Sequence, residues 1–416
     1  MAHKSSTAAL PIEVPAPNDD TRTRILRPAN PRRKGRLEVL ESQVGRLLDR
    51  MNIAVVYGGD SKEPQAVINR TMSTRSWKSY KAVAEDIAAS LSRLGARNVQ
   101  LLADDMTLGE NMRRAGIHMA WLNTGGVQGF SPMSHAAAML EMFGIPYVGH
   151  DPLTSGMLDN KLAFKRELKA LGVPTAPFLA WHPSRGPLKP EASREFAAVF
   201  GGFDGPFVVK PVCGRASLHV HVVDDRARLP EVAAEVHEAS GNQVLIETYL
   251  PGREYCMAIA GTIVSQGRRL RNVGGPFAFS AAERRLDQGE RIFTSMDMRA
   301  ISTDRVHLLD IAAEPEVDAQ LREIAKTVFV QLGLETLIRL DLRAGPDDQI
   351  CVLEANPKPD LKQPDGVKTS IVCVGLESEG MDYDDLILSL LADRIDLLFS
   401  QRRGAVGHLA ALLDEK

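Results

Sequence analysis

The chain has 416 residues, of which 44% are hydrophobic and 25% charged, values typical of a globular protein with two or three domains. Its 50 basic and 53 acidic residues give a net charge of −3, which argues against a nucleic-acid-binding protein because such proteins carry excess basic groups. No apolar run approaches the roughly 20 residues that span a bilayer. Four widely spaced cysteines without a C-x-x-C pair argue against a disulfide framework and predict a cytoplasmic protein.

The N-terminal segment, residues 1–50, is predicted to be a disordered tail followed by a short helix. Proline and polar residues dominate its first part, which cannot bury enough apolar surface to fold. Apolar residues between Leu37 and Leu48 then recur at helical spacing. This pattern predicts an amphipathic helix that docks on the folded body.

Residues 51–153 are predicted to form a parallel α/β domain. Short apolar runs predict strands at residues 52–57, 99–102, 119–122 and 145–148, with a helix near residues 77–94. Strands that alternate with helices favour a parallel sheet.

Two further units are expected, a central one at residues 154–246 and a C-terminal one at residues 247–416. The central unit has a helix at residues 161–171 and strands at residues 207–210 and 244–247. The C-terminal unit has strands at residues 254–259, 337–342 and 350–354, and a long amphipathic helix between Val317 and Leu332.

Two strands near the C-terminus contain charged residues that predict a metal site. A turn at residues 345–348 joins them, and alternation of side chains puts Glu354 and Asn356 on one face with Asp341 able to lie opposite. Two carboxylates and an amide oxygen suit Mg²⁺ that bridges nucleotide phosphates. Arg339 shares the face of Asp341 and could stabilise a transferring phosphoryl group. The alternative is a surface hairpin with scattered acids.

Two lysines are candidates for holding phosphate. Lys210 ends an apolar strand and Lys161 opens a helix, and a lysine is a compact positive charge. Pro211 leads from the strand into a glycine-containing loop at residues 212–217, whose backbone N–H groups can face a phosphate. Either lysine alone could equally be an ordinary surface residue.

The segment of residues 246–254 is a candidate nucleoside site. The main chain of Thr248 and Leu250 could contact the base, and the carboxylates of Glu247 and Glu254 could contact the sugar hydroxyls. Taken alone, the segment could also be an ordinary hairpin.

Taken together, six segments resemble the D-alanine–D-alanine ligase family of ATP-grasp enzymes. They are residues 55–63, 139–149, 160–161, 208–211 and 245–254, and residues 339–341 together with 353–356. The similarity covers about residues 52–395. It implies an α/β (α+β) ATP-grasp fold of three domains, with ATP held between the second and third domains.

The resemblance also implies a role for each matching residue. Phosphates would be held by Lys161 and Lys210, the nucleoside by Glu247, Thr248, Leu250 and Glu254, and Mg²⁺ or Mn²⁺ by Asp341, Glu354 and Asn356. The residues placed in catalysis are Arg339, Glu63 near the amine of the first substrate, Arg284 and Ser217. ATP would phosphorylate a carboxylate, and an amine would then attack the acyl phosphate.

The part of the pattern that binds the substrates departs from the family. The departures are Asn123–Gly126 in place of a His-Gly motif, Arg215 and His219 in a loop of small residues, Arg284-Arg285 at the flexible lid, and residues 357–362 after Asn356. The added cations favour an acidic substrate and make D-alanine doubtful on either side. These side chains could also point outward or bind only the phosphates of ATP.

The leading hypothesis is an ADP-forming ligase for amino acids or a small metabolite that contains an amino acid. An authentic D-alanine–D-alanine ligase of peptidoglycan synthesis is the close rival, and a nucleotide-binding module without turnover is the third candidate. The expected partners are small substrates, with no nucleic acid and no membrane. A homodimer is compatible with each of these hypotheses.

Overall fold

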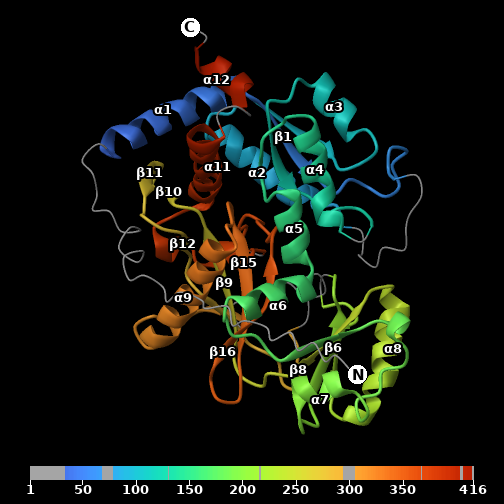
Figure 1. The fold of residues 1–416 in the computed structure, drawn as a ribbon. Helices are drawn as coiled ribbons and strands as arrows, with labels where there is room; N and C mark the ends of the chain where they lie inside the picture. The colour runs from blue at the N-terminus through green and yellow to red at the C-terminus, as the bar shows by residue number, and fades with distance from the viewer. Residues whose placement is uncertain are drawn as a thin grey trace, which may run out of the picture.

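The computed structural model describes residues 33–67, 78–129, 131–214, 217–293, 305–366, 368–402 and 406–414. Three sheet-containing regions stack along the long direction of the molecule, with the N-terminal region at one end and the central one at the other (Figure 1). The predicted disordered tail, residues 1–32, lies outside the described residues.

The N-terminal region is a parallel sheet in the order β2-β1-β3-β4. Its strands are β1 (Asn52–Tyr57), β2 (Asn98–Ala103), β3 (Met119–Asn123) and β4 (Tyr147–Val148), and its helices are α2 (Lys81–Arg93), α3 (Leu108–Arg114), α4 (His135–Met142) and the short η2 (Pro132–Ser134). The central strand β1 pairs on both sides, with Val55 opposite Leu101 and Trp121. A strand that is buried on both faces consists of an unbroken run of apolar residues, and such a run is what allows the sequence to predict β1.

Helix α1 (Arg33–Arg50) is the docking helix that the sequence predicts. Leu40, Val44 and Leu47 are buried in one core with residues of α2 and of the C-terminal helix α11 (Tyr383–Gln401). Arg36 forms an ion pair with Asp396 of α11, 2.7 Å apart. A last helix, α12 (Gly407–Asp414), packs against α1. The C-terminus of the chain therefore completes the N-terminal region.

The central region is an antiparallel sheet in the order β5-β8-β6-β7. Its elements are β5 (Phe178–Trp181), β6 (Phe207–Pro211), β7 (His221–Val223), β8 (Val244–Thr248), α7 (Arg194–Phe200), α8 (Leu229–Ser240), η3 (Pro183–Arg185) and η4 (Arg226–Arg228). Aromatic packing joins the helices to the sheet, with the rings of Phe200 and Phe207 meeting edge to face at 5.3 Å.

The third sheet has the order β14-β13-β9-β15-β16, and β12 also pairs with β9. Its strands are β9 (Glu254–Ala260), β12 (Phe277–Ala278), β13 (Ala282–Arg284), β14 (Val306–Leu308), β15 (Ile338–Ala344) and β16 (Ile350–Asn356). A separate hairpin of β10 (Ile263–Gln266) and β11 (Arg269–Asn272), the helices α9 (Pro315–Gln331) and α10 (Ile371–Val374), and η5 (Glu377–Glu379) complete this part.

Helices α5 (Pro152–Asp159) and α6 (Lys161–Ala170) pack on the third sheet. Leu158, Phe164 and Leu168 share its hydrophobic core. The segment predicted to open the central unit is therefore packed with the C-terminal sheet, because its apolar face covers that sheet. The three-domain division with a boundary at residue 154 remains a proposal.

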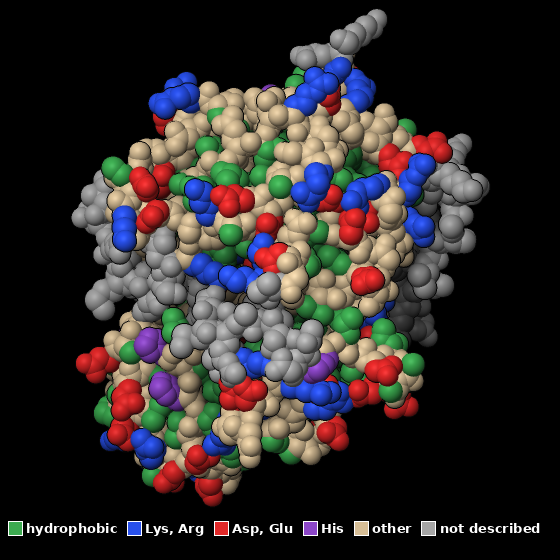
Figure 2. All heavy atoms as spheres, turned by 180° about the vertical axis from the view of Figure 1, so that it is seen from behind, with side chains coloured by type: hydrophobic (Ala, Val, Ile, Leu, Met, Phe, Trp, Pro, Cys, Tyr) green, Lys and Arg blue, Asp and Glu red, His purple; other side chains and the backbone are tan. Residues whose placement is uncertain are grey.

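Acidic and basic side chains are intermixed over the face shown in Figure 2, in keeping with the small net charge. In the part of the chain that the structure describes, no helix is long and apolar enough to cross a membrane.

Candidate active site

A cavity of about 270 Å³ lies where the three regions meet. The predicted site residues that line it are Lys161, Lys210, Ser217, Glu247, Thr248, Leu250, Glu254, Arg284, Arg339, Asp341, Glu354 and Asn356. The fold thus brings together residues that lie almost 200 positions apart in the sequence.

The predicted metal residues lie opposite one another on β15 and β16. In the antiparallel register, Asp341 pairs with Glu354 and Arg339 pairs with Asn356. The register shifts just after Asp341, and such irregularities re-aim side chains at functional sites. Two carboxylates directly across a ladder repel each other, so the arrangement favours a bound cation.

Asp341 is buried and surrounded by positive charge. Arg339 holds it with two hydrogen bonds, Nε to Oδ1 at 2.7 Å and Nη2 to Oδ2 at 3.0 Å, and Arg284 donates to Oδ2 at 3.2 Å. Burial alone would raise the pKa of Asp341, but Arg284 and Arg339 outweigh it and lower that pKa to about 2. The carboxylate is therefore ionised and fixed in orientation.

Arg284, which the sequence places with Arg285 in a flexible lid, lies on strand β13. Strand β13 pairs with β9, so Arg284 stands beside Glu254 and forms an ion pair with it. Its guanidinium thus joins Glu254 to Asp341. The neighbouring Arg285 is exposed. The sequence alone does not show which of the two neighbouring arginines points into the protein.

Glu247 is the counter-ion of two lysines. Its Oε2 lies 2.9 Å from Lys210 Nζ and its Oε1 lies 3.1 Å from Lys165 Nζ, with the carboxylate 2% exposed. Burial would raise the pKa of Glu247, but Lys165 and Lys210 lower it. Both oxygens face a lysine, and contact of Glu247 with the sugar hydroxyls of a nucleoside remains a prediction.

Sequence reasoning missed Lys165, which pairs with the cavity-lining residue Glu247. Its ammonium group is completely buried and also donates to Thr175 Oγ1, which in turn donates to the carbonyl of Val352 on β16. One feature of the sequence could have identified Lys165: it lies four residues after Lys161, on the same face of α6. Through Glu247, this chain of contacts links Lys210 to the strand that carries Glu354.

Lys161 is held at the N-terminus of α6, pointing toward Glu354. Its Nζ lies 3.1 Å from Glu354 Oε2 and donates to the carbonyl of Gly214 at 3.3 Å. Asn160 caps the helix by accepting a hydrogen bond from the N–H of Ala163. Lys161 and Lys210 therefore bracket the loop after β6 that was predicted to face phosphate.

The predicted nucleoside segment follows β8. The N–H of Thr248 donates to the carbonyl of Pro177 at 3.1 Å, so a contact from this residue to a base would use its carbonyl group. Glu254 is paired with Arg284 and lies 3.5 Å from Arg343 Nη1. Leu250 is buried at the edge of the cavity.

The donor set fits a divalent cation that also binds phosphate. Glu354 is 30% exposed, and the side-chain carbonyl of Asn356 is an oxygen ligand of the kind that such cations take. No cluster of three His, Cys, Asp or Glu side chains suited to a metal occurs within the described ranges. Mg²⁺ needs only one or two protein carboxylates when phosphates and water complete its shell, so Asp341, Glu354 and Asn356 are compatible with such an ion, and their role as its ligands remains a prediction.

Comparison with known proteins decides the family. The model of the D-ala D-ala ligase C-terminus matches residues 168–392, which is more than half of the chain. This chain belongs to the D-alanine–D-alanine ligase family. The predictions of an ATP-grasp fold, of a ligase, and of ATP with a divalent metal as cofactors are thereby confirmed.

Relatives and solved structures match over most of the chain. The D-alanine–D-alanine ligase of Synechococcus sp. strain JA-2-3B'a(2-13) is 26% identical over 348 residues, covering 83% of this chain and 93% of the relative. That of Caulobacter sp. strain K31 is 27% identical over 349 residues, covering 82% and 93%. The Bacillus anthracis D-alanine–D-alanine ligase, solved as a complex with ATP, has a TM-score of 0.60 at 19% identity, covering 83% of this chain and 98% of that one.

Two residues that the family resemblance implies for catalysis differ in where the structure places them. Glu63 is exposed in a turn after β1, and it is absent from the cavity lining among the described residues. Ser217 lines the cavity with a positive φ of 52°, and its hydroxyl donates to the carbonyl of Phe293 at 3.3 Å. Arg215 lies outside the described residues. The roles of Glu63 and Ser217 remain predictions.

Proposed function

We propose that this chain is an ADP-forming ligase that joins the carboxylate of one small amino-acid-like substrate to the amine of another. The observation that carries the proposal is the meeting of two phosphate-binding lysines with opposed carboxylates and buried arginines in a single cavity. The proposed reaction has two steps. A carboxylate oxygen attacks the γ-phosphorus of ATP and ADP leaves; the amine then attacks the acyl carbon and phosphate leaves.

The lysines would neutralise the phosphate oxygens during transfer. Lys210 is already paired with Glu247, so its charge is held in place by a buried counter-ion. Lys161 would exchange its contact with Glu354 for a phosphate oxygen. Charge-assisted hydrogen bonds of this kind, together with positioning, supply most of the catalysis in phosphoryl transfer.

The metal residues would be Asp341, Glu354 and Asn356. A divalent ion bound there would supply electrostatic stabilisation of the transferring phosphoryl group. Arg339 and Arg284 keep Asp341 ionised and fixed, as their hydrogen bonds to it indicate. Among the residues described, these two arginines also bring positive charge next to the strand face on which transfer would occur.

The substrates are proposed to be small molecules of the amino-acid type. D-alanine as both substrates is the second candidate. It is favoured by the Synechococcus and Caulobacter relatives, which are named D-alanine–D-alanine ligases and match this chain over 93% of their length. Location in the cytoplasm, the lack of a nucleic-acid partner and a homodimeric assembly are also proposals; the net charge of −3 supports the second of them.

The experiment is a measurement of ADP release by the purified chain with ATP and Mg²⁺, against a panel of D- and L-amino acids added singly and in pairs. A pair that stimulates ADP release and yields a condensed product identified by mass spectrometry supports the ligase. ADP release that no panel member changes, with no condensed product, contradicts it. Full turnover with D-alanine alone selects the second candidate.

A further inference from the structure

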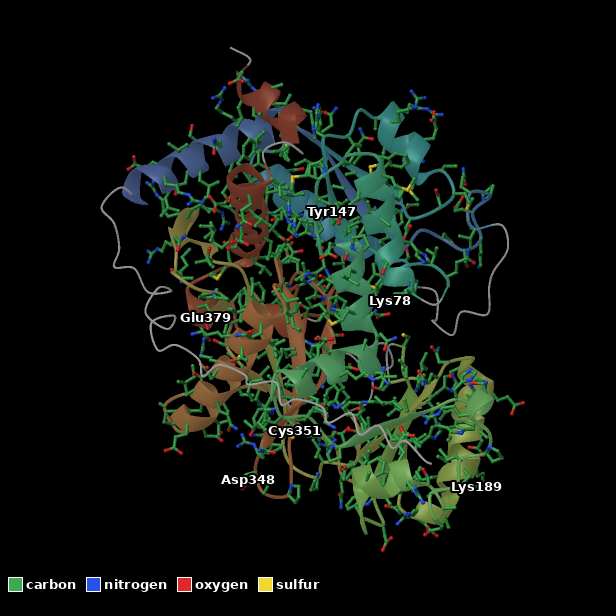
Figure 3. All side chains as sticks on the ribbon, viewed as in Figure 1. Lys78, Tyr147, Lys189, Asp348, Cys351 and Glu379 are labelled. Carbon is green, nitrogen blue, oxygen red and sulfur yellow. The ribbon has the colours of Figure 1, made fainter. Side chains whose placement is uncertain are left out.

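Arg343 lines the cavity beside the predicted nucleoside segment, residues 246–254. It follows Arg339 and Asp341 on β15 at a spacing of two residues, so the three side chains share one face of the strand. Figure 3 labels Cys351, which is the partner of Arg343 in the ladder of β15 and β16. Cys351 shares a hydrophobic cluster with a residue of the nucleoside segment. Arg343 therefore lies where the third sheet meets this segment.

The guanidinium group of Arg343 holds the nucleoside segment at three points. Its Nε donates to the carbonyl of Gly252 at 3.1 Å, and its Nη2 donates to the hydroxyl of Tyr249 at 3.0 Å. Its Nη1 lies 3.5 Å from Oε2 of Glu254, the residue that faces Arg343 on strand β9. The side chain of Arg343 is only 6% exposed, and its planar group presents the donors in a fixed arrangement. These contacts fix the turn between β8 and β9.

A second wall of the cavity is formed by residues 291–293, which are called the bridging segment. They lie between β13 and β14 in the chain, and the last two of them line the cavity. The carbonyl of Arg291 accepts two hydrogen bonds, from Arg343 Nη1 at 3.0 Å and from the hydroxyl of Tyr249 at 3.2 Å. Arg343 and Tyr249 thus tie the bridging segment to the nucleoside segment.

The bridging segment is also joined to the central region. Arg291 Nη1 forms an ion pair with Asp224, which follows β7, at 2.6 Å, and the hydroxyl of Ser217 donates to the carbonyl of Phe293 at 3.3 Å. The side chains of Arg291 and Asp224 are 37% and 73% exposed, and exposed ion pairs stabilise a structure only weakly. The buried contacts of Arg343 are therefore the firmer attachment.

Tyr249 lies at the centre of these contacts. The guanidinium carbons of Arg291 and Arg343 lie 4.8 Å and 4.9 Å from the centroid of its ring. Its hydroxyl accepts a hydrogen bond from Arg343 and donates one to the carbonyl of Arg291. A polar network whose donors and acceptors are satisfied holds its side chains in one arrangement. The cavity wall at the nucleoside segment is therefore formed by the chain itself.

We infer that Arg343 is a positioning residue for the nucleotide, because it fixes the nucleoside segment and the bridging segment against each other. The inference rests on the proposed function and deepens it by naming a residue that prepares the site for ATP. A site that is fixed beforehand loses less conformational freedom when its ligand binds. The phosphates would be held by Lys161 and Lys210, in the part of the cavity called the phosphate end. Arg343 should therefore affect the affinity for the nucleotide and not the transfer of the phosphoryl group.

The test measures ADP binding to the full chain by calorimetry in the presence of Mg²⁺, so it requires no amino-acid substrate. Arg343→Met keeps the length of the side chain, and it should weaken ADP binding about tenfold, the loss expected for hydrogen bonds from a charged group. Arg343→Lys keeps the charge but donates from a single nitrogen, so its affinity should lie between the two. An unchanged affinity in Arg343→Met would overturn the inference.

Smaller changes test the contacts through which Arg343 acts. Tyr249→Phe removes one hydroxyl group and should weaken ADP binding about threefold. Combined with Arg343→Met, it should add less than its separate effect, because both changes remove the same hydrogen bond. Asp224→Asn removes an exposed ion pair and should weaken binding less than about threefold. Additive effects of the first pair, or a larger effect of Asp224→Asn than of Arg343→Met, would contradict the inference.

The matched control is Arg322→Met on helix α9. Arg322 also donates to a backbone carbonyl, that of Ala278, and pairs with Glu379, but it is not among the described residues that line the cavity. Figure 3 places Glu379 away from Cys351. This variant should lower the melting temperature and leave ADP affinity within about twofold, as expected for a distant site. If it weakens ADP binding as much as Arg343→Met does, the effect reflects stability alone and the inference fails.

Kinetic measurements separate failure of the inference from failure of the proposed function. In the assay of ADP release, Arg343→Met should raise the KM for ATP about tenfold and change kcat and the KM for the amino acid less than about twofold. A lower kcat with an unchanged KM for ATP would overturn the inference. If no amino acid stimulates ADP release, the ligase proposal fails, and ADP binding still decides the role of Arg343. A native chain that does not bind ADP would overturn both.

Discussion

The cations at the two ends of the cavity make different contacts. At the phosphate end, arginines and lysines are paired with buried carboxylates such as Glu247 and Asp341. At the end around Tyr80, the ammonium groups of Lys78 and Lys358 both lie over the aromatic ring, and Lys358 also donates to Oδ1 of Asn123. Buried ion pairs hold side chains in place at a cost in desolvation, so the charged residues of the phosphate end are held in position by one another.

The largest expected effect is at the phosphate end. Glu354→Gln and Asp341→Asn should each lower kcat by about a thousandfold or more, because each removes a charge from the proposed metal site. The measurement is ADP release at limiting and saturating Mg²⁺, with Glu316→Gln, an exposed residue of α9, as the control. Near-normal rates in both variants at limiting Mg²⁺ would remove the metal assignment.

An intermediate effect is expected from the buried lysine. Lys165→Met removes one of the two lysine partners of Glu247 and leaves Lys210 paired with it, so the loss of stability should be smaller than the roughly 3–5 kcal/mol that an unpaired buried charge costs. Denaturant unfolding should show this loss, and the KM for ATP should rise because Lys210 loses its fixed neighbour. Adding Glu247→Gln should lower the stability further, because Lys210 then loses its buried counter-ion.

The exposed Lys169 on the same helix provides the control, as Lys169→Met. If Lys165→Met has the stability and the KM for ATP of this control, Lys165 does not position the phosphate lysine.

The smallest effect is on the pH dependence of stability. The pKa of Asp341 in the folded chain is about 2, below its ordinary value of 3.8. The stabilisation of the folded state by the ionised Asp341 carboxylate is therefore fully present above about pH 4 and is lost as the pH falls toward 2. The difference in unfolding free energy between the native chain and Asp341→Asn should shrink by about 2 kcal/mol over that range. A difference that stays constant from pH 6 to pH 2 would contradict the low pKa.

The sequence predicts those parts of the molecule that repeat a local pattern. Strand β1 is an unbroken apolar run and α1 has apolar residues at helical spacing, and both are present. Asp341 and Glu354 could be placed opposite each other because a short turn forces their strands to pair. Predicting these features requires only residues that are close to one another in the sequence.

The remainder depends on long-range packing that local patterns do not encode. Arg284 lies in the base of the site because β13 pairs with β9. Glu247 meets Lys165 because α6 packs close to β8, which brings together residues 82 positions apart in the sequence. Lys78 and Lys358 meet at one ring from opposite ends of the chain. Each contact is a result of tertiary structure.

The most direct test of the ligase account follows one oxygen atom. The acyl substrate found in the amino-acid panel is prepared with ¹⁸O in its carboxylate group, and the phosphate released during turnover is examined by mass spectrometry. The account predicts one ¹⁸O atom transferred to phosphate for each product molecule, because the carboxylate oxygen that attacks the γ-phosphorus leaves with it. Phosphate that carries no label from the substrate would contradict the acyl phosphate route.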